Sequence, residues 1–151
     1  MMLIALITAS GVMAGIYFAF SVFVMKSLAQ LPVQEGIRAM NSINKVIVKT
    51  AFLPLFFLSS IGHLALIIYA FISDNYAAGL LVPAGVIYIG GMFMVTVLGN
   101  VPLNNRLAAA STHGGTASGA LWNGYLLRWG RLNHIRTGSC IAATLLMLLA
   151  L

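Results

Sequence analysis

The residues best suited to chemistry lie at the start of the last apolar segment of the chain. Two tryptophans, a tyrosine, an asparagine and an arginine follow one another at intervals of three or four residues: Trp122, Tyr125, Trp129, Asn133 and Arg136. On an α-helix this spacing places all five side chains on one face, here called the stripe. An interfacial aromatic belt with a snorkelling arginine explains the aromatic members. It does not explain polar groups where the helix enters lipid.

Polar side chains from two other segments are expected at the same membrane face as the stripe. A polar group inside lipid needs a hydrogen-bond partner from the protein. The candidates are Asn100, Asn104 and Asn105 after the third apolar segment, and Asn41 and Asn44 before the second. Together with His134, which stands beside the stripe, they leave two interpretations open. One is a polar pocket with aromatic walls, and the other is a hydrogen-bond cluster with a purely structural role.

Motifs that serve several kinds of soluble enzyme are missing from the chain. There is no P-loop, no glycine-rich dinucleotide motif, no zinc-protease HExxH and no GxSxG nucleophile motif. Glu35 and Asp74 are the only carboxylates, and the orientation derived below places them on opposite sides of the membrane. A carboxylate-bridged di-iron site needs several facing acidic ligands, so this class is excluded. Proton transport through carboxylates is disfavoured for the same reason.

The histidines show no metal-ligand spacing. His63 falls in the middle of the second apolar segment, about 20 Å deeper than His134 on the rise of an α-helix, so the two do not share a metal within one subunit. A histidine inside the membrane is a functional candidate, yet a hydrogen bond from His63 to a neighbouring helix is the simpler interpretation. His113 is expected to be solvated in a glycine-rich loop. Cys140, the only cysteine, is expected to be a buried apolar group.

The elements that must position these residues follow from the composition. Hydrophobic residues make up 61% of the 151 residues and charged residues 7%, whereas soluble domains are about 45–50% apolar and about 25% charged. The surplus apolar surface must face lipid. The net charge of +6 comes from Lys and Arg side chains between apolar segments, which fits anionic headgroups better than nucleic acid.

The apolar segments predict a single all-α domain over residues 1–151, an integral membrane bundle of four transmembrane helices. Each helix needs about 20 residues to cross the hydrocarbon core. The expected spans are approximately 1–25, 50–73, 77–101 and 135–151, with a loop over 107–120. The first span lacks the basic start and cleavage site of a signal peptide, so we expect it to be retained. Ile37, Met40 and Ile47 recur at helical spacing, which predicts a short amphipathic helix in the first connection.

Four motifs give the chain a resemblance to a known family. GVMAGIYFAFSVFVMKSL lies in the first segment, AMNSIN precedes the second, NVPLNNRL begins at residue 100, and WxxYxxxWxxxNHxRT begins at residue 122. Over nearly its whole length the chain resembles the anthrone oxygenase-like family of small membrane proteins, many of which have no assigned function. The resemblance implies a four-helix membrane bundle. Family members with an assigned role oxidise anthrones to anthraquinones with dioxygen, without a flavin or haem.

The resemblance also implies roles for the residues above. A cofactor-free oxygenase needs a base to remove the acidic proton of an anthrone and donors to hold the enolate oxygen. His134 suits the base, because an imidazole exchanges protons near neutral pH. The expected oxyanion donors are Arg136, Asn133, Asn100 and Asn104, and the expected substrate-binding residues are Trp122, Tyr125, Trp129, Asn44 and Met40. Dioxygen is then the co-substrate; the chain carries no flavin or haem motif, and a metal on His134 stays an open alternative.

Three functions therefore remain under consideration. The first is a membrane oxidoreductase, a monooxygenase acting on a small lipophilic aromatic substrate at the cytoplasmic face. The second is a non-catalytic scaffold or partner subunit in which the polar cluster locks helix ends together, and the third is a carrier for a small hydrophobic compound. The expected partner is the lipid bilayer and not nucleic acid, and glycines on the helix faces favour a homo-oligomer.

The distribution of cations predicts the orientation in a bacterial inner membrane. Lys26, Arg38, Lys45 and Lys49 lie in or beside the first connection, Arg106, Arg128, Arg131 and Arg136 surround the third, and the second carries only Asp74. The positive-inside rule then places the first and third connections in the cytoplasm and both termini outside. A reporter that is active only outside the cytoplasm should therefore be active when fused to the C terminus. Activity of a cytoplasm-dependent reporter at that position would contradict this orientation.

Overall fold

The computed structural model describes residues 1–73, 77–112 and 119–151, and within these ranges the chain is helical with short connections and no strand. Asp74 of the second connection and the solvated position expected for His113 lie outside the described residues. Four helices are long and apolar enough to cross a membrane. This confirms the predicted all-α membrane bundle.

The helices follow one another with few interruptions. The first span is continuous from α1 (Met2–Ala19) through the π-helical turn η1 (Phe20–Val24) to α2 (Met25–Ala29). A short helix, α3 (Val33–Ile47), leads to the second span, α4 (Phe52–Ile72). The third span comprises α5 (Ala78–Tyr88), the π-helical segments η2 (Ile89–Met94) and η3 (Thr96–Asn100), and α6 (Val101–Thr112). The fourth span is one helix, α7 (Gly119–Leu149).

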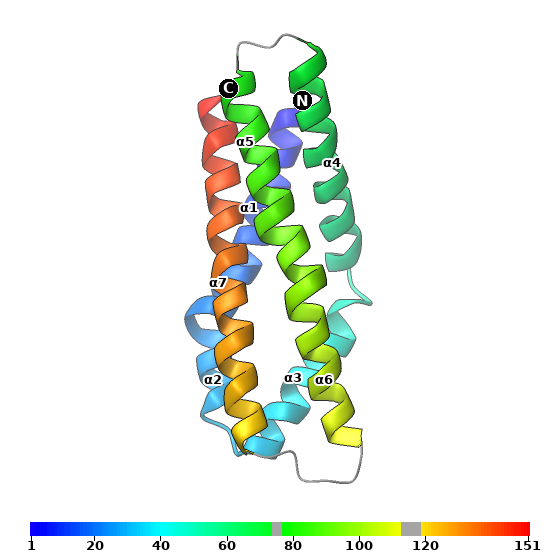
Figure 1. Cartoon of the computed structure of the whole chain (residues 1–151), viewed down its shortest axis with the longest axis vertical. Helices are drawn as coiled ribbons and strands as arrows, with labels where there is room; N and C mark the ends of the chain where they lie inside the picture. Colours follow the sequence, from blue (N-terminus) through cyan, green and yellow to red (C-terminus); the bar gives the residue numbers. More distant parts are fainter. Residues whose placement is uncertain (74–76, 113–118) are drawn as a thin grey trace.

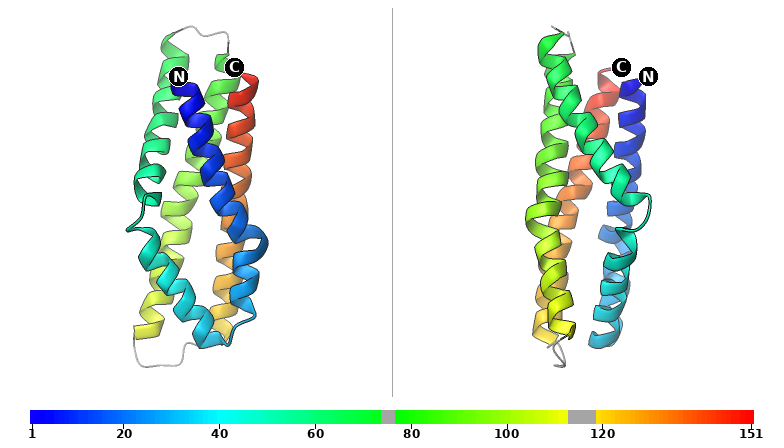
Figure 2. Two further views of the ribbon diagram at one scale, coloured as in Figure 1. Left: turned by 180° about the vertical axis from the view of Figure 1, so that it is seen from behind. Right: turned by 90° about the vertical axis from the view of Figure 1, so that its right-hand side faces the viewer.

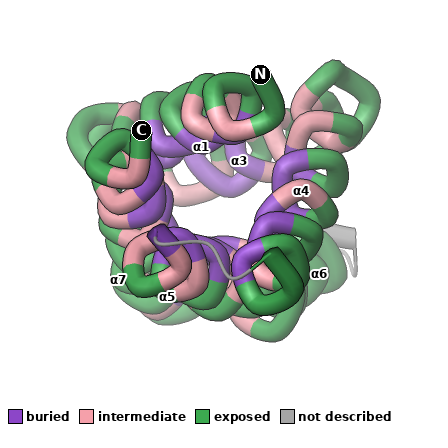
Figure 3. The backbone as a smooth tube through the Cα atoms, turned by 90° about the horizontal axis from the view of Figure 1, so that it is seen from above, coloured by how far each residue is buried: buried purple, intermediate pink, exposed green. Residues whose placement is uncertain are grey.

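The spans form an elongated bundle with both termini at one end and α3 at the other (Figure 1). Seen along the bundle, buried faces point toward a common axis and exposed faces point outward (Figure 3). The outward faces carry large apolar side chains, among them Leu58, Phe71 and Leu98. An apolar surface of this kind requires lipid around the bundle.

The half of the bundle near the termini forms an apolar core. Its fully buried members include Met13, Ala84, Tyr88, Cys140 and Met147. The buried thiol of Cys140 confirms the expectation from the sequence. A Cβ at Gly91 would collide with Ser139, so the close approach of the third span to α7 depends on glycine at this position.

The helix α3 is the predicted amphipathic helix, and it closes the end of the bundle opposite the termini. Its buried face consists of Gly36, Ile37 and Met40, whereas its charged residues are exposed. This face packs against Leu107 and Trp122, so α3 lies across the ends of α6 and α7. A Cβ at Gly36 would approach the Trp122 ring to 2.9 Å, so a larger residue would push α3 away.

The third span continues further than the sequence pattern predicts. The loop expected over 107–120 is wrong at both ends, because α6 extends the helix to Thr112 and α7 begins at Gly119. Pro102 does not end the helix, because η3 precedes it and the amide after η3 bonds to the carbonyl of Thr96, five residues back. The wider π-helical turn accommodates a proline ring that would crowd a regular helix. The extension places Asn104 on a helix facing α3 and α7.

The helix α4 leans across the bundle (Figure 2). Near its C-terminal end it packs along α5, where Gly85 lies against Ile67 and the backbone of His63. Toward its start it moves away from the third span and toward α1. The divergence of α4 from η3 and α6 leaves a space in the half of the bundle near α3, and the candidate site occupies this space.

Candidate functional site

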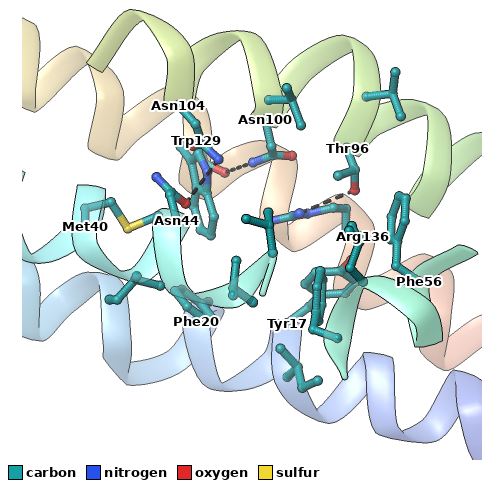
Figure 4. A pocket seen from close by; sticks show the side chains of 18 of the residues that line it. Tyr17, Phe20, Met40, Asn44, Phe56, Thr96, Asn100, Asn104, Trp129 and Arg136 are labelled. Carbon is teal, nitrogen blue, oxygen red and sulfur yellow. Dashed lines mark hydrogen bonds between the residues drawn. The ribbon is translucent and has the colours of Figure 1, made fainter. Parts of the chain in front are cut away.

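A pocket of about 220 Å³ lies among α1, η1, α3, α4, η3, α6 and α7 (Figure 4). Most of its lining is apolar or aromatic. The aromatic side chains include Tyr17, Phe20, Phe56 and Trp129, and the polar side chains include Asn44, Thr96, Asn100, Asn104 and Arg136. Apolar walls with a few convergent polar groups are typical of small-molecule sites.

Among the described residues, Arg136 is the only charged side chain that lines this pocket, and it is 4% exposed. Its Nη2 donates to the Oδ1 of Asn133 at 2.7 Å, and its Nη1 donates to the Oγ1 of Thr96 at 3.3 Å. The guanidinium lies over the rings of Tyr17, at 4.3 Å, and Trp129, at 5.0 Å. No carboxylate of the described residues pairs with it, so its charge is compensated only by neutral groups and ring faces.

Arg136 also lies deep in the bundle. It is about 20 Å along α7 from the end of that helix at Leu149. Because the hydrocarbon core is about 30 Å thick, the guanidinium lies within the depth of the acyl chains. A cation at this depth is costly and marks a functional position by default.

Asn133 holds the guanidinium from behind. Its Nδ2 donates to the Tyr17 carbonyl at 2.8 Å and to the Oγ of Ser21 at 2.7 Å, while its Oδ1 accepts from Arg136. The Oγ of Ser21 lies 3.0 Å from that of Thr137, which donates to the Asn133 carbonyl at 2.9 Å. These bonds tie α7 to the first span at η1, where π-helical bonding interrupts the regular ladder. The position of Arg136 is therefore fixed by both helices.

A second hydrogen-bond chain crosses the α3 side of the pocket. The Tyr125 hydroxyl donates to the Oδ1 of Asn104 at 2.8 Å, and the Nδ2 of Asn104 donates to the Oδ1 of Asn44 at 3.1 Å. The Tyr125 ring stacks on Trp122 with centroids 5.6 Å apart. This chain links α7, α6 and α3, and it holds its two asparagines at the pocket wall.

Several polar atoms of lining residues have no hydrogen-bond partner among the described residues. Three are donors, namely Arg136 Nε, Trp129 Nε1 and Asn44 Nδ2, and one is an acceptor, Asn100 Oδ1. The Nδ2 of Asn100 makes one long bond, 3.4 Å, to the Trp129 carbonyl. Buried polar atoms without partners are costly. Their excess of donors fits a ligand that carries carbonyl or hydroxyl oxygens on an apolar body.

The structure brings together most of the predicted site residues. Met40, Asn44, Asn100, Asn104, Trp129 and Arg136 line the pocket, and all five stripe residues are buried on the inner face of α7. Asn133 lies behind Arg136, whereas Trp122 and Tyr125 pack beneath α3 outside this lining. Their predicted contact with a substrate is not supported by this arrangement.

His134 is separated from the pocket. Its side chain is exposed and lies in a groove on the outer side of the bundle with Lys26 and Asn123. Successive residues of an α-helix are about 100° apart, so a residue next to Asn133 points away from the face that carries Arg136. The predicted base, His134, and the predicted oxyanion donors Asn133 and Arg136 therefore lie on different faces of α7.

Tyr17 and Thr96 are site residues that the sequence reasoning did not identify. Thr96 stands four residues before Asn100, which stands four before Asn104, so helical spacing from the asparagines could have found it. Tyr17 lies inside an apolar run, and only its contact with Arg136 distinguishes it from other membrane-helix tyrosines.

His63 belongs to a separate, structural cluster. Its Nδ1 bonds to the Ser59 carbonyl at 2.8 Å, its Nε2 lies 3.3 Å from the Oγ of Ser10, and its ring stacks on Tyr88 with centroids 3.8 Å apart. Both ring nitrogens thus have partners on α1 or α4. Within the described ranges, no group of three or more His, Cys, Asp or Glu side chains is placed to hold a metal.

A comparison with models of protein families gives a match. A family model described as anthrone oxygenase matches residues 45–146, about two thirds of the chain. The matched region covers α4, the third span and most of α7, and therefore Asn100, Asn104, Trp129 and Arg136. No curated protein and no solved structure matches the chain.

The surroundings of Arg136 and Asn133 predict opposite effects of replacing them. Arg136→Met removes a buried cation without a carboxylate partner and keeps an apolar side chain of similar length, so the melting temperature in detergent should stay the same or rise. Asn133→Ala removes the bonds to the Tyr17 carbonyl and to Ser21, and it takes away the acceptor of the Arg136 Nη2. It should lower the free energy of unfolding by about 1–3 kcal/mol. If Arg136→Met destabilises the protein as much as Asn133→Ala, the arginine is structural.

Proposed function

Because the chain belongs to the anthrone oxygenase family, we propose that it is a membrane-embedded oxygenase that oxidises a flat, lipophilic aromatic compound with dioxygen. The observation that carries the proposal is Arg136, a buried cation without a carboxylate partner in the described chain, at the wall of an apolar pocket. A structural role alone would favour an apolar residue at this depth. A substrate oxygen would supply the missing compensation.

The pocket fits an aromatic substrate with an oxygen at one edge. The rings of Tyr17 and Trp129 flank the guanidinium, and Phe20 lies 5.5 Å from Trp129 between centroids. Flat rings pack favourably against such walls. The edge oxygen would face Arg136, and the rest of the ring system would contact the apolar lining. The volume of about 220 Å³ suits a small polycycle and not a phospholipid.

Arg136 would favour the enol or enolate form of an anthrone-type ketone. In such a compound, the methylene opposite the carbonyl loses a proton and the negative charge moves to oxygen. A fixed, desolvated cation stabilises charge that develops there. The Oδ1 of Asn100 has no donor among the described residues, so it can accept a hydrogen bond from an enol hydroxyl. The two residues together would hold the reactive tautomer.

Oxidation then needs only dioxygen as co-reactant. The electron-rich enol carbon forms a bond to one oxygen atom, and the enol proton moves to the other, which gives a hydroperoxide. Loss of the remaining proton from that carbon, with cleavage of the O–O bond, leaves a carbonyl and releases water. One anthrone and one dioxygen thus give one anthraquinone and one water. The carbon is oxidised by four electrons, and dioxygen is reduced by four.

His134 takes no part in this scheme, because it faces a groove outside the pocket. None of the described residues that line the pocket is a histidine or a carboxylate. The protein would therefore act by shifting the keto–enol equilibrium of the substrate, and not by a strong general base.

A non-catalytic scaffold or partner subunit is the alternative. It is favoured by the two hydrogen-bond chains, through Asn133 and through Asn104, which tie α3 and the first, third and fourth spans together at one end of the bundle. In this alternative, Arg136 only connects helices through its hydrogen bonds to Thr96 and Asn133. Only a reaction distinguishes the two.

The first test is oxygen uptake by purified protein supplied with anthrone. The wild-type protein should consume one dioxygen per anthraquinone formed. Arg136→Met should lower the rate by about 10²–10³-fold, the usual effect of removing one oxyanion donor, and Arg136→Lys should retain part of it. The matched control is His134→Ala on the outer face of the same helix, which should leave the rate unchanged. Equal rates for Arg136→Met and the wild type would reject the assignment.

A further inference from the structure

The pocket beside Arg136 has its mouth on the side of the bundle. Four lining residues are apolar and substantially exposed: Val48 (50%), Phe57 (47%), Val97 (41%) and Val101 (42%). The first two belong to the α3–α4 side of the pocket, and the other two belong to the η3–α6 side. The mouth therefore lies where α4 diverges from the third span.

The mouth lies at the depth of lipid chains. Phe57 is about 8 Å along the axis from the start of α4 at Phe52, and Val97 is about 28 Å from the start of the third span at Ala78. For a hydrocarbon core about 30 Å thick, both positions fall just inside its boundary on the α3 side. The exposed apolar rim thus reaches from the edge of the acyl chains, at Phe57 and Val97, to the level of the headgroups, at Val48 and Val101.

The α3 end of the pocket is closed. Ile37 and Met40 are fully buried against α6 and α7. The hydrogen-bond chain from Tyr125 through Asn104 to Asn44 crosses the same end. A molecule that came from the water on this side would have to separate α3 from two helices and break this chain.

The opposite end of the pocket is closed by aromatic packing. Phe56 stacks on Phe93 with centroids 5.2 Å apart, and Tyr17 meets Phe52 edge to face at 6.3 Å. Beyond these rings lies the apolar core around Tyr88 and Met92. The pocket is thus walled toward both ends of the bundle and has an exposed apolar rim on one side.

We propose that the ligand of this pocket reaches Arg136 sideways from the hydrocarbon layer, through the mouth between α4 and η3–α6. Its occupant is a lipophilic aromatic molecule that dissolves among acyl chains with its oxygen near the headgroup boundary. An apolar rim favours this route, because a lipid-dissolved molecule crosses it without exposing apolar surface to water. The inference concerns access and holds whether or not the bound molecule is oxidised.

Tryptophan quenching in bilayers tests this route. The chain has two tryptophans: Trp129 lines the pocket, whereas Trp122 is buried beneath α3. In vesicles of phosphatidylcholine with brominated acyl chains, the Trp122→Phe variant reports Trp129 alone, and the Trp129→Phe variant reports Trp122. Trp129 should be quenched more strongly than Trp122, although both are nearly fully buried. Acrylamide, a quencher dissolved in water, should affect Trp129 little.

A variant that fills the mouth of the pocket with larger side chains, here called the plug, is compared with a control variant beside it. Val97→Phe with Val101→Phe should lower quenching of Trp129 by brominated chains to the level of Trp122. Leu98→Phe places a phenylalanine at a neighbouring exposed position outside the pocket lining, and it should leave quenching unchanged. If Trp122→Phe does not fold, the plug and its control are compared with both tryptophans present. Two results would overturn the lateral route. One is equal quenching by brominated chains in the Val97→Phe/Val101→Phe variant and in Leu98→Phe, and the other is strong quenching of Trp129 by acrylamide.

Discussion

Burial of the Arg136 guanidinium at acyl-chain depth is the constraint on which this half of the structure depends. A cation there cannot be hydrated, and no carboxylate in the described ranges neutralises it. Its positive charge is compensated by hydrogen bonds to Asn133 and Thr96 and by the ring faces of Tyr17 and Trp129. The π-helical turns η1 and η3 lie in the first and third spans, which provide Tyr17 and Thr96. Interruptions of this kind are frequent at functional sites.

The same constraint explains the division of the bundle into two halves. Near the termini, the helices pack around apolar side chains, and His63 has partners for both ring nitrogens. Near α3, the helices separate around Arg136, and several polar atoms lack partners within the described chain. The pocket and the polar atoms without partners thus lie together in the half near α3. Functional sites often contain buried polar groups without partners, whereas the rest of the fold keeps its polar groups paired and its core packed.

The sequence predicted the parts of this arrangement that follow from helical periodicity. The stripe from Trp122 to Arg136 is buried as its spacing predicts, and α3 is amphipathic. Helix phase also separates His134 from Asn133 and Arg136, since neighbouring residues of an α-helix are about 100° apart. The continuation of the third span past Pro102 could not be read from periodicity, because π-helical turns change the phase and relieve the proline.

The pocket itself was less predictable than its residues. The asparagines of α3 and α6 were expected near the stripe, and Asn44 and Asn104 do bond to one another. The lean of α4, which opens the side of the bundle, depends on tertiary packing at Gly85 and at the start of α4. The periodicity of residues along the chain does not predict the angle between α4 and the other helices. The fold class thus followed from composition, while the shape of the site required the structure.

The most direct test of the central claim is the affinity of anthraquinone for the detergent-purified protein, measured by quenching of tryptophan fluorescence for the wild type and Arg136→Met. A hydrogen bond from a buried cation to a quinone oxygen is worth about 1.5–3 kcal/mol, which corresponds to at least about tenfold in affinity. The account predicts saturable binding to the wild type and a loss of this size in the variant. Equal affinity of the two proteins, or no saturable binding to either, would contradict it.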